Sequence, residues 1–429
     1  MKLKSSKSKM PRLSRMHVGA CVGTALLAAG PSAFAQQTES GNTVRMERLE
    51  KENAELKKRL DALETMAQKE GLAPSATGPK FVKSLSEMQI SGFVTASYFY
   101  DTSTPKDRKS NGYLWNTSED SFSINKVKLT LASPPAERSG EKFSAGYRAS
   151  LIFGEDAAVV NTGGEVQGLE SLREAFIDLN VPLGSGLNVK AGQLISLLNY
   201  ESGDGGAANA NFSQGYQWFY TGNGPSAGVQ LGYTFTDWLD VKARVQNGMY
   251  AGAIDNDDCK TLMGAIGLKP AKDLWISLIG FAGRENPGFT VAGGSVLAGY
   301  QIQNLGLGFE FDYFNFDRAA GNKSDLWSIG GWLTYDFTAQ WGIGLRAEFL
   351  DDTDGFGING VGLAGRPGSA ILSPDSNGEL GSVALTLNYK PWPNVKIQPE
   401  IRFDRTSYKN GFDGAESRFL IGTGVSYLF

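Results

Sequence analysis

The segment 417–429 alternates between apolar side chains and polar or small ones. Such a pattern predicts a strand with one face toward lipid and the other toward water, as in a membrane-spanning β-barrel. The apolar face holds Phe419, Ile421, Val425, Tyr427 and Phe429, and the opposite face holds Arg418, Gly422, Gly424 and Ser426.

From Met88 onward the same period of two recurs, which predicts a series of strands. Beyond the first 35 residues, no segment approaches the run of about 18 apolar residues that a spanning helix needs. Sixteen strands are predicted, at 88–100, 122–133, 143–156, 169–183, 187–199, 226–236, 238–250, 261–270, 273–285, 294–303, 305–318, 324–337, 341–353, 379–390, 394–407 and 417–429.

The connections between these strands alternate in length. Those after even-numbered strands are short, and most of those after odd-numbered strands are longer, notably 101–121, 200–225 and 354–378. Outer-membrane barrels have short periplasmic turns and longer external loops. The predicted fold is therefore an all-β, sixteen-stranded antiparallel transmembrane barrel over 88–429, with both of its ends on the periplasmic side.

Two features of the predicted strands agree with this orientation. Three tryptophans fall at predicted periplasmic turns, where an amphipathic ring suits the membrane interface: Trp238, Trp341 and Trp392. The residues predicted to face lipid on the second, eleventh and thirteenth strands are Val127, Leu129, Leu131, Leu307, Phe309, Phe311, Tyr313, Ile343, Leu345, Ala347 and Phe349.

The amino-terminal segment 1–35 has the layout of a secretory signal. Basic residues precede an apolar stretch from Val18 to Gly30, and Ala33-Phe34-Ala35 matches a cleavage site. A membrane anchor is the alternative, but the apolar stretch is short for one. Cleavage would remove six of the 41 basic residues and leave 35 against 45 acidic ones, a charge of −10. A nucleic-acid partner is therefore not expected.

The predicted signal also holds the single histidine, His17, and one of the two cysteines, Cys21. Without histidine, Ser-His and Cys-His catalysis and imidazole-bound metals are excluded for the mature chain. Acidic clusters at Asp351–Asp354 and Asp255–Asp258 do not match an EF-hand spacing. No enzyme activity, metal or cofactor is expected.

Residues 36–70 are predicted to contain a periplasmic coiled coil, followed by a linker over 71–87. Apolar positions recur at spacings of three and four, as in the seam of a coiled coil. A single docked helix is the alternative to self-association, and the seam does not decide between a dimer and a trimer. The predicted oligomerisation residues are Met46, Leu49, Asn53, Leu56, Leu60 and Leu63.

A barrel of sixteen strands leaves an aqueous lumen unless a loop fills it. The interior parity places a basic wall on strands 2, 3, 15 and 16 and a more acidic wall on strands 4 to 12. Such walls would create a transverse field; local ion pairs on a solvated wall are the alternative. The predicted pore-lining residues are Lys126, Lys128, Arg148, Glu174, Asp178, Lys242, Arg244, Glu310, Asp312, Arg346, Glu348, Arg402 and Arg418.

The third external connection, 200–225, combines bends and aromatic rings and is the predicted constriction loop. Glycines would let it turn inward, and aromatic side chains would pack on the wall. Capping of the mouth or contact with a neighbouring subunit is the alternative. Its candidate residues are Glu201, Asp204, Phe212, Tyr216 and Trp218.

Three segments resemble a known family: Ile90-Ser-Gly-Phe-Val-Thr-Ala-Ser-Tyr98, Leu172-Arg-Glu-Ala-Phe-Ile-Asp-Leu-Asn-Val-Pro-Leu-Gly184 and Val189-Lys-Ala-Gly-Gln-Leu194. They resemble the OmpL-like β-barrel porins. The order of signal, coiled coil, linker and barrel is similar to that of the DcaP-like trimeric porins.

The resemblance implies an outer-membrane porin, a homotrimer surrounded by lipid and lipopolysaccharide, that lets small hydrophilic solutes and ions diffuse passively. A selective uptake channel for small organic anions and a structural barrel with a closed pore are the alternatives.

Overall fold

The computed structural model describes residues 48–63, 65, 87–110, 112, 115–161, 169–249, 251–255, 258–285, 289–318, 323–352, 355–357, 378–408 and 411–429. The chain divides into two compact units, Met1–Met66 and Ala67–Phe429. The predicted signal, Met46 and most of the predicted linker lie outside the described residues.

The first unit contains a helix through residues 48–63 and 65. Two ion pairs at a spacing of four residues join Arg48 to Glu52 and Arg59 to Glu55 on its surface, which favours the helical conformation. The predicted seam residues of this helix are all solvent-exposed in the single chain: Leu49, Asn53, Leu56, Leu60 and Leu63. In the described part of the chain, no helix has the length and apolar character needed to cross a membrane.

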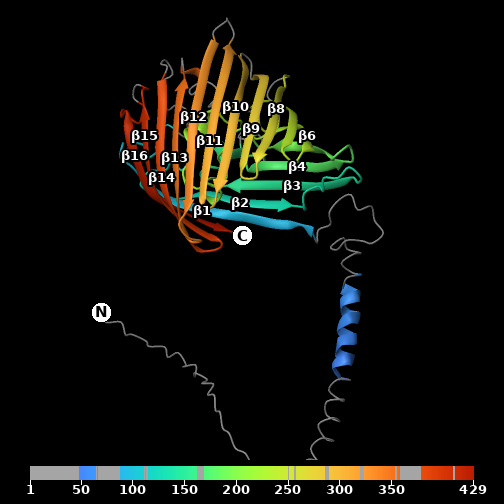
Figure 1. Cartoon of the computed structure of the whole chain (residues 1–429). Coiled ribbons are helices and arrows are strands. Elements are labelled where there is room, and N and C mark those ends of the chain that lie inside the picture. The colour runs from blue at the N-terminus through green and yellow to red at the C-terminus, as the bar shows by residue number, and fades with distance from the viewer. Residues whose placement is uncertain are drawn as a thin grey trace, which may run out of the picture. The chain divides into compact units, whose positions relative to one another are not determined.

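The second unit is a closed antiparallel barrel of sixteen strands in which each strand pairs with its neighbours in sequence and β1 pairs with β16 (Figure 1). The predicted fold class is confirmed. The strands are β1 (Gln89–Asp101), β2 (Ser121–Ala132), β3 (Ser144–Phe153), β4 (Leu172–Val181), β5 (Leu187–Leu194), β6 (Ser226–Thr236), β7 (Leu239–Gln246), β8 (Thr261–Ala271), β9 (Leu274–Glu285), β10 (Phe289–Ile302), β11 (Leu305–Arg318), β12 (Lys323–Asp336), β13 (Trp341–Asp352), β14 (Gly378–Trp392), β15 (Val395–Thr406) and β16 (Ser417–Leu428).

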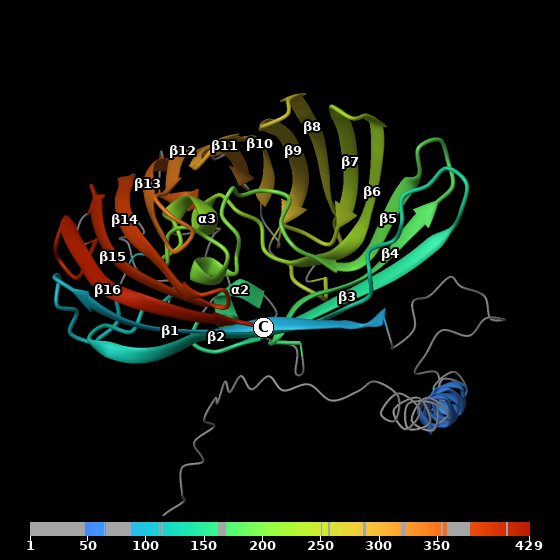
Figure 2. The same cartoon turned by 60° about the horizontal axis from the view of Figure 1, so that its bottom comes forward.

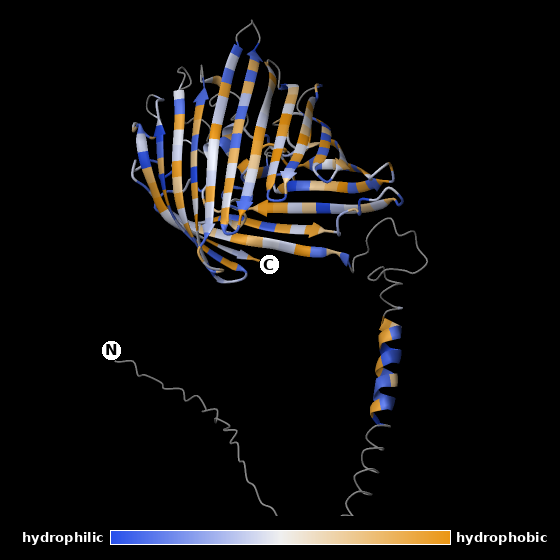
Figure 3. Cartoon of the chain, in the orientation of Figure 1, coloured by the Kyte–Doolittle hydropathy of each residue, from blue (hydrophilic) through white to orange (hydrophobic). Residues whose placement is uncertain are grey.

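Burial alternates along the strands as the sequence predicts, and the colouring by hydropathy shows the same alternation (Figure 3). On β11, Phe309 and Phe311 are exposed on the outer face, whereas Glu310 and Asp312 are buried on the inner face. A bulge interrupts this parity on β2, where Thr95 pairs with Lys126 but Ala96 pairs with Ile124. Asn125 is the extra residue, and both it and Lys126 are therefore buried.

Several predicted strands are too long at one end. The third ends at Phe153, the fifth at Leu194 and the seventh at Gln246, while the tenth begins earlier than predicted, at Phe289. The connections contain three short helical segments: α2 (Ala157–Asn161), the 3-10 turn η2 (Gly205–Ala207) and α3 (Tyr216–Tyr220). We call the end of the barrel with the short connections the turn end, and the opposite one the loop end.

Candidate functional site

The connection between β5 and β6 folds into the barrel instead of projecting from it, and Figure 2 shows α3 enclosed by the strands. We call residues 195–225 the inner loop. It contains all five predicted constriction residues, and Phe212 and Tyr216 are buried.

Carboxylates of the barrel wall hold the main chain of the inner loop. Glu348 on β13 accepts hydrogen bonds from the backbone N–H groups of Tyr216 (2.8 Å) and Gln217 (3.0 Å). Glu400 on β15 accepts one from Phe212 N–H at 2.7 Å. Buried polar groups are costly unless they are paired, so these contacts satisfy the wall and the loop together.

Two more predicted wall carboxylates also hold the loop. Glu310 accepts from Tyr200 N–H at 2.8 Å, and Asp312 accepts from the Gln217 amide at 2.8 Å and the Thr221 hydroxyl at 2.7 Å. Glu310 and Asp312 lie on the interior face of the barrel, as their parity predicts, but the inner loop covers them.

A buried ion pair fixes the start of the inner loop. Arg346 on β13 lies 2.9 Å from Glu201, and its guanidinium also donates to the Ser213 carbonyl at 2.6 Å. Glu201 in turn accepts from Gly215 N–H at 2.7 Å. Removing one partner of a buried pair costs about 3–5 kcal/mol, so this pair is a strong determinant of the loop position.

The two inward-facing arginines of β15 and β16 do not form an open basic wall. Arg402 lies 2.6 Å from Asp404, and Arg418 lies 3.0 Å from Asp404 and 3.2 Å from Asp101. Both arginines are buried. The predicted field between two opposite walls is therefore replaced on this side by local ion pairs under the inner loop, because the loop excludes the water that would have solvated them.

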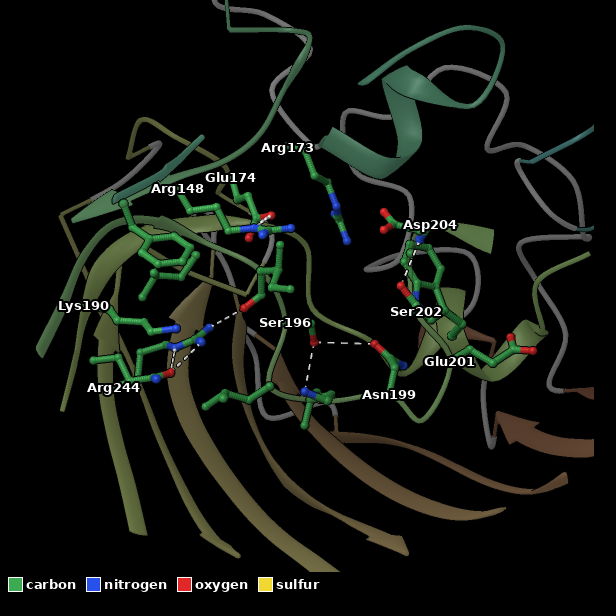
Figure 4. A pocket seen from close by; sticks show the side chains of 18 of the residues that line it. Arg148, Arg173, Glu174, Lys190, Ser196, Asn199, Glu201, Ser202, Asp204 and Arg244 are labelled. Carbon is green, nitrogen blue, oxygen red and sulfur yellow. Dashed lines mark hydrogen bonds and ion pairs between the residues drawn. The ribbon is translucent and has the colours of Figure 1, made fainter. Parts of the chain in front are cut away.

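Between the inner loop and strands β2–β7 lies a cavity of about 590 Å³, which we call the chamber (Figure 4). Four predicted basic residues line it, together with Arg173 and Lys190. The six cations that line the chamber are Lys128, Arg148, Arg173, Lys190, Lys242 and Arg244, against the three carboxylates Glu174, Glu201 and Asp204.

Each carboxylate of the chamber is bound to a cation. Glu174 lies 2.6 Å from Arg148, and Asp204 of the inner loop lies 2.8 Å from Lys128; Glu201 is held by Arg346. The predicted lumenal Asp178 is buried near its strand neighbour Asn188, which donates to it at 2.5 Å, and does not line the chamber.

Lys242 lies 3.6 Å from Asp240 on its own strand. Arg173, Lys190 and Arg244 remain without a carboxylate within 4 Å in the described ranges. Arg244 donates to the Gln230 side chain at 2.7 Å and to the Ile195 carbonyl at 2.8 Å, which are neutral acceptors. Arg173 donates to the Val160 carbonyl. The Lys190 ammonium lies 4.7 Å from the centre of the Phe176 ring. The chamber therefore carries an excess of positive charge.

The connections at the loop end pack over the inner loop. Asp156, directly before α2, lies 2.8 Å from Lys126 and accepts from Asn116 N–H at 2.7 Å. Burial raises the pKa of the Asp156 carboxyl above its ordinary value, although Lys126 lowers it in part. The Trp115 ring packs edge-on to Trp218 with 4.4 Å between their centres.

Sequence reasoning missed Arg173 as a lining residue. Its neighbour Glu174 was expected to face inward, and strict alternation would then turn Arg173 outward, but both are buried. The pairing of β3 with β4 shifts between Ser150 and Leu151 at this position, and such an irregularity leaves no signal in the pattern of apolar residues. Among the described residues, no group of three or more acidic, cysteine or histidine side chains is arranged to hold a metal ion.

A family model described as "Putative beta-barrel porin-2, OmpL-like" matches residues 87–429, the whole of the barrel. The chain belongs to this family. It is accordingly an OmpL-like outer-membrane porin, and the resemblance inferred from its short motifs is confirmed. No curated protein matches it.

Solved structures with the same fold include other porins. The anion-selective porin from Comamonas acidovorans aligns with a TM-score of 0.55 at 12% identity, over 80% of this chain and 99% of that one. The outer-membrane channel DcaP of Acinetobacter baumannii aligns with a TM-score of 0.51 at 13% identity, over 80% and 97%. At such identities these likenesses show the barrel fold of the OmpL-like porin and no more.

Proposed function

We propose that this OmpL-like porin is a passive diffusion channel for small hydrophilic solutes and ions, with a preference for anions. The observation that carries the proposal is the charge of the chamber, where Arg173, Lys190 and Arg244 have no carboxylate partner within 4 Å among the described residues. Fixed charges on the wall of a water-filled passage attract counter-ions and repel ions of like charge.

Reversal potentials in a salt gradient test this function. The protein is reconstituted in a planar bilayer with unequal KCl concentrations on the two sides. We expect a reversal potential whose sign shows that chloride carries more current than potassium. Lys190→Gln is expected to reduce this preference. Lys390→Gln is the matched control, since Lys390 is an exposed lysine outside the chamber. A cation-preferring wild-type channel, or equal effects of the two variants, would contradict the proposal.

We also infer that the predicted signal is removed and that residues 36–70 assemble the barrels into a trimer on the periplasmic side. The exposed leucines of the described helix support self-association, because an isolated helix of this length is only marginally stable in water.

A further inference from the structure

A second cavity lies inside the barrel near its turn end. Its volume is about 410 Å³, and we call it the vestibule. Tyr200 and Glu201 line both the vestibule and the chamber. A solute in one space is therefore next to the other.

Two aromatic rings come close to the wall of the vestibule at positions where the wall residue is glycine. A side-chain carbon added to Gly299 would lie 2.3–2.8 Å from three atoms of the Trp275 indole, and one added to Gly308 would lie 2.2–2.6 Å from three atoms of the Tyr200 phenol. These glycines are directly paired across β10 and β11.

The two rings are close to each other and nearly parallel. Their centres are 6.0 Å apart and their planes differ by only 10°. The Trp332 ring of β12 stacks on Tyr200 as well, with 4.7 Å between the centres of these two rings. Trp275 and Tyr200 both line the vestibule, and we call them together the aromatic platform.

The platform leaves apolar surface open to the lumen. Trp275 points inward and is 38% exposed, whereas the inward-facing Phe281, Phe314 and Trp332 are 5%, 0% and 7% exposed. Exposed apolar area that is not needed for packing commonly marks a binding surface.

Polar groups at the vestibule have unused hydrogen-bonding capacity. In the described part of the chain, the Tyr200 hydroxyl and the Trp275 indole N–H have no hydrogen-bond partner. The Thr334 hydroxyl has only a long contact, 3.5 Å, to the Gly306 carbonyl. Small side chains, Ala208 and Ala210, leave room above the rings.

We propose that the vestibule binds a saccharide ring that carries an acidic group, such as a uronic acid. The C–H bonds on one face of a sugar ring have a partial positive charge and suit the negative face of an aromatic ring. Its hydroxyl groups match the three polar groups, which a purely aromatic solute would leave unsatisfied. The adjoining chamber attracts the acidic group, so the inference rests on the proposed anion preference.

Interruption of the ionic current tests the site. Sodium glucuronate, glucose and sodium benzoate are added separately to the reconstituted wild-type channel. We expect glucuronate to interrupt the current in a saturable way and at a lower concentration than either of the others. Trp275→Leu should raise the half-blocking concentration at least tenfold and leave the reversal potential in KCl unchanged, whereas Trp238→Leu, at an exposed tryptophan of a turn, should have no effect.

Thr334→Val provides a second variant that keeps the ring platform, and a several-fold weaker block is expected for it. Failure of glucuronate to block an anion-preferring channel would overturn the saccharide site and leave the proposed function standing. Stronger block by benzoate, or unchanged block in both Trp275→Leu and Thr334→Val, would overturn it as well. A wild-type channel without anion preference would instead refute the proposed function.

Discussion

Replacement of Glu348 by glutamine tests whether wall carboxylates hold the inner loop in place. The Glu348 carboxylate accepts from two successive backbone N–H groups, those of Tyr216 and Gln217, and lies 3.6 Å from Arg346. Glutamine has one carbonyl oxygen, so its NH₂ group would face one of these N–H donors.

The expected cost can be worked from these contacts. One buried donor left without a partner costs about 1–3 kcal/mol, and hydrogen bonds to a charged acceptor are stronger than those to a neutral one by about 1 kcal/mol. The sum is on the order of 3 kcal/mol, which raises the population of channels with a displaced loop on the order of 100-fold.

Single-channel recording measures this population as excess open-channel noise and as additional conductance levels. Glu379→Gln is the matched control because Glu379 is exposed on the neighbouring strand. A quiet Glu348→Gln channel with wild-type conductance would refute the reasoning.

A disulfide tether shows whether the noise comes from the loop. A side-chain carbon added to Gly344 would lie 2.8 Å from the Cβ atom and 2.9 Å from the carbonyl oxygen of Ala210. The loop backbone at Ala210 must therefore move away from Gly344 to reach the Cβ separation of about 3.5–4.5 Å that a disulfide needs. In a Cys259→Ser background, Ala210→Cys and Gly344→Cys should suppress the noise of Glu348→Gln when oxidised and release it when reduced.

Two further predictions concern the helix and Asp156. Replacing Leu56 and Leu60 by asparagine should dissociate the oligomer in mild detergent, as measured by light scattering, while the barrel stays folded; an unchanged mass would contradict the role of the seam. Burial raises the pKa of the Asp156 carboxyl above its value in the unfolded chain. The connection between β3 and β4 is therefore most stable when Asp156 is protonated, and it loses stability as the pH rises from the ordinary aspartate range to the raised pKa. Lys126→Met should move this window upward, seen as a shift in the pH dependence of channel noise, and adding Asp156→Asn should abolish the shift; a shift that persists would point to another group.

The outer face of the barrel could be predicted because lipid imposes a simple rule. Residues such as Phe309 and Phe311 must be apolar, so the period of two is visible in the sequence. On β2, by contrast, Asn125 and Lys126 both turn inward because of a bulge. The interior tolerates polar residues at both positions, so the sequence does not reveal the bulge.

The interior was predictable only in composition. The parity of Arg402 and Glu348 is evident from the sequence, but the backbone groups of the inner loop that they bind belong to a segment far away in the chain. Whether a charge faces water or a loop depends on how that loop is folded, and no periodicity describes it. The aromatic platform was missed for the same reason, since Gly299 and Gly308 become meaningful only when a ring lies over them.

Most of the wall carboxylates that hold the inner loop bind its main chain and not its side chains. Every amino acid except proline supplies the same N–H group, so many side chains of this loop are exchangeable without loss of its course. The barrel can thus keep one rigid partition while the chemistry displayed on it diverges. Substitutions at Ser202 and Asp204, which face the chamber, offer a route to retune permeation that leaves Glu348 and Glu400 untouched.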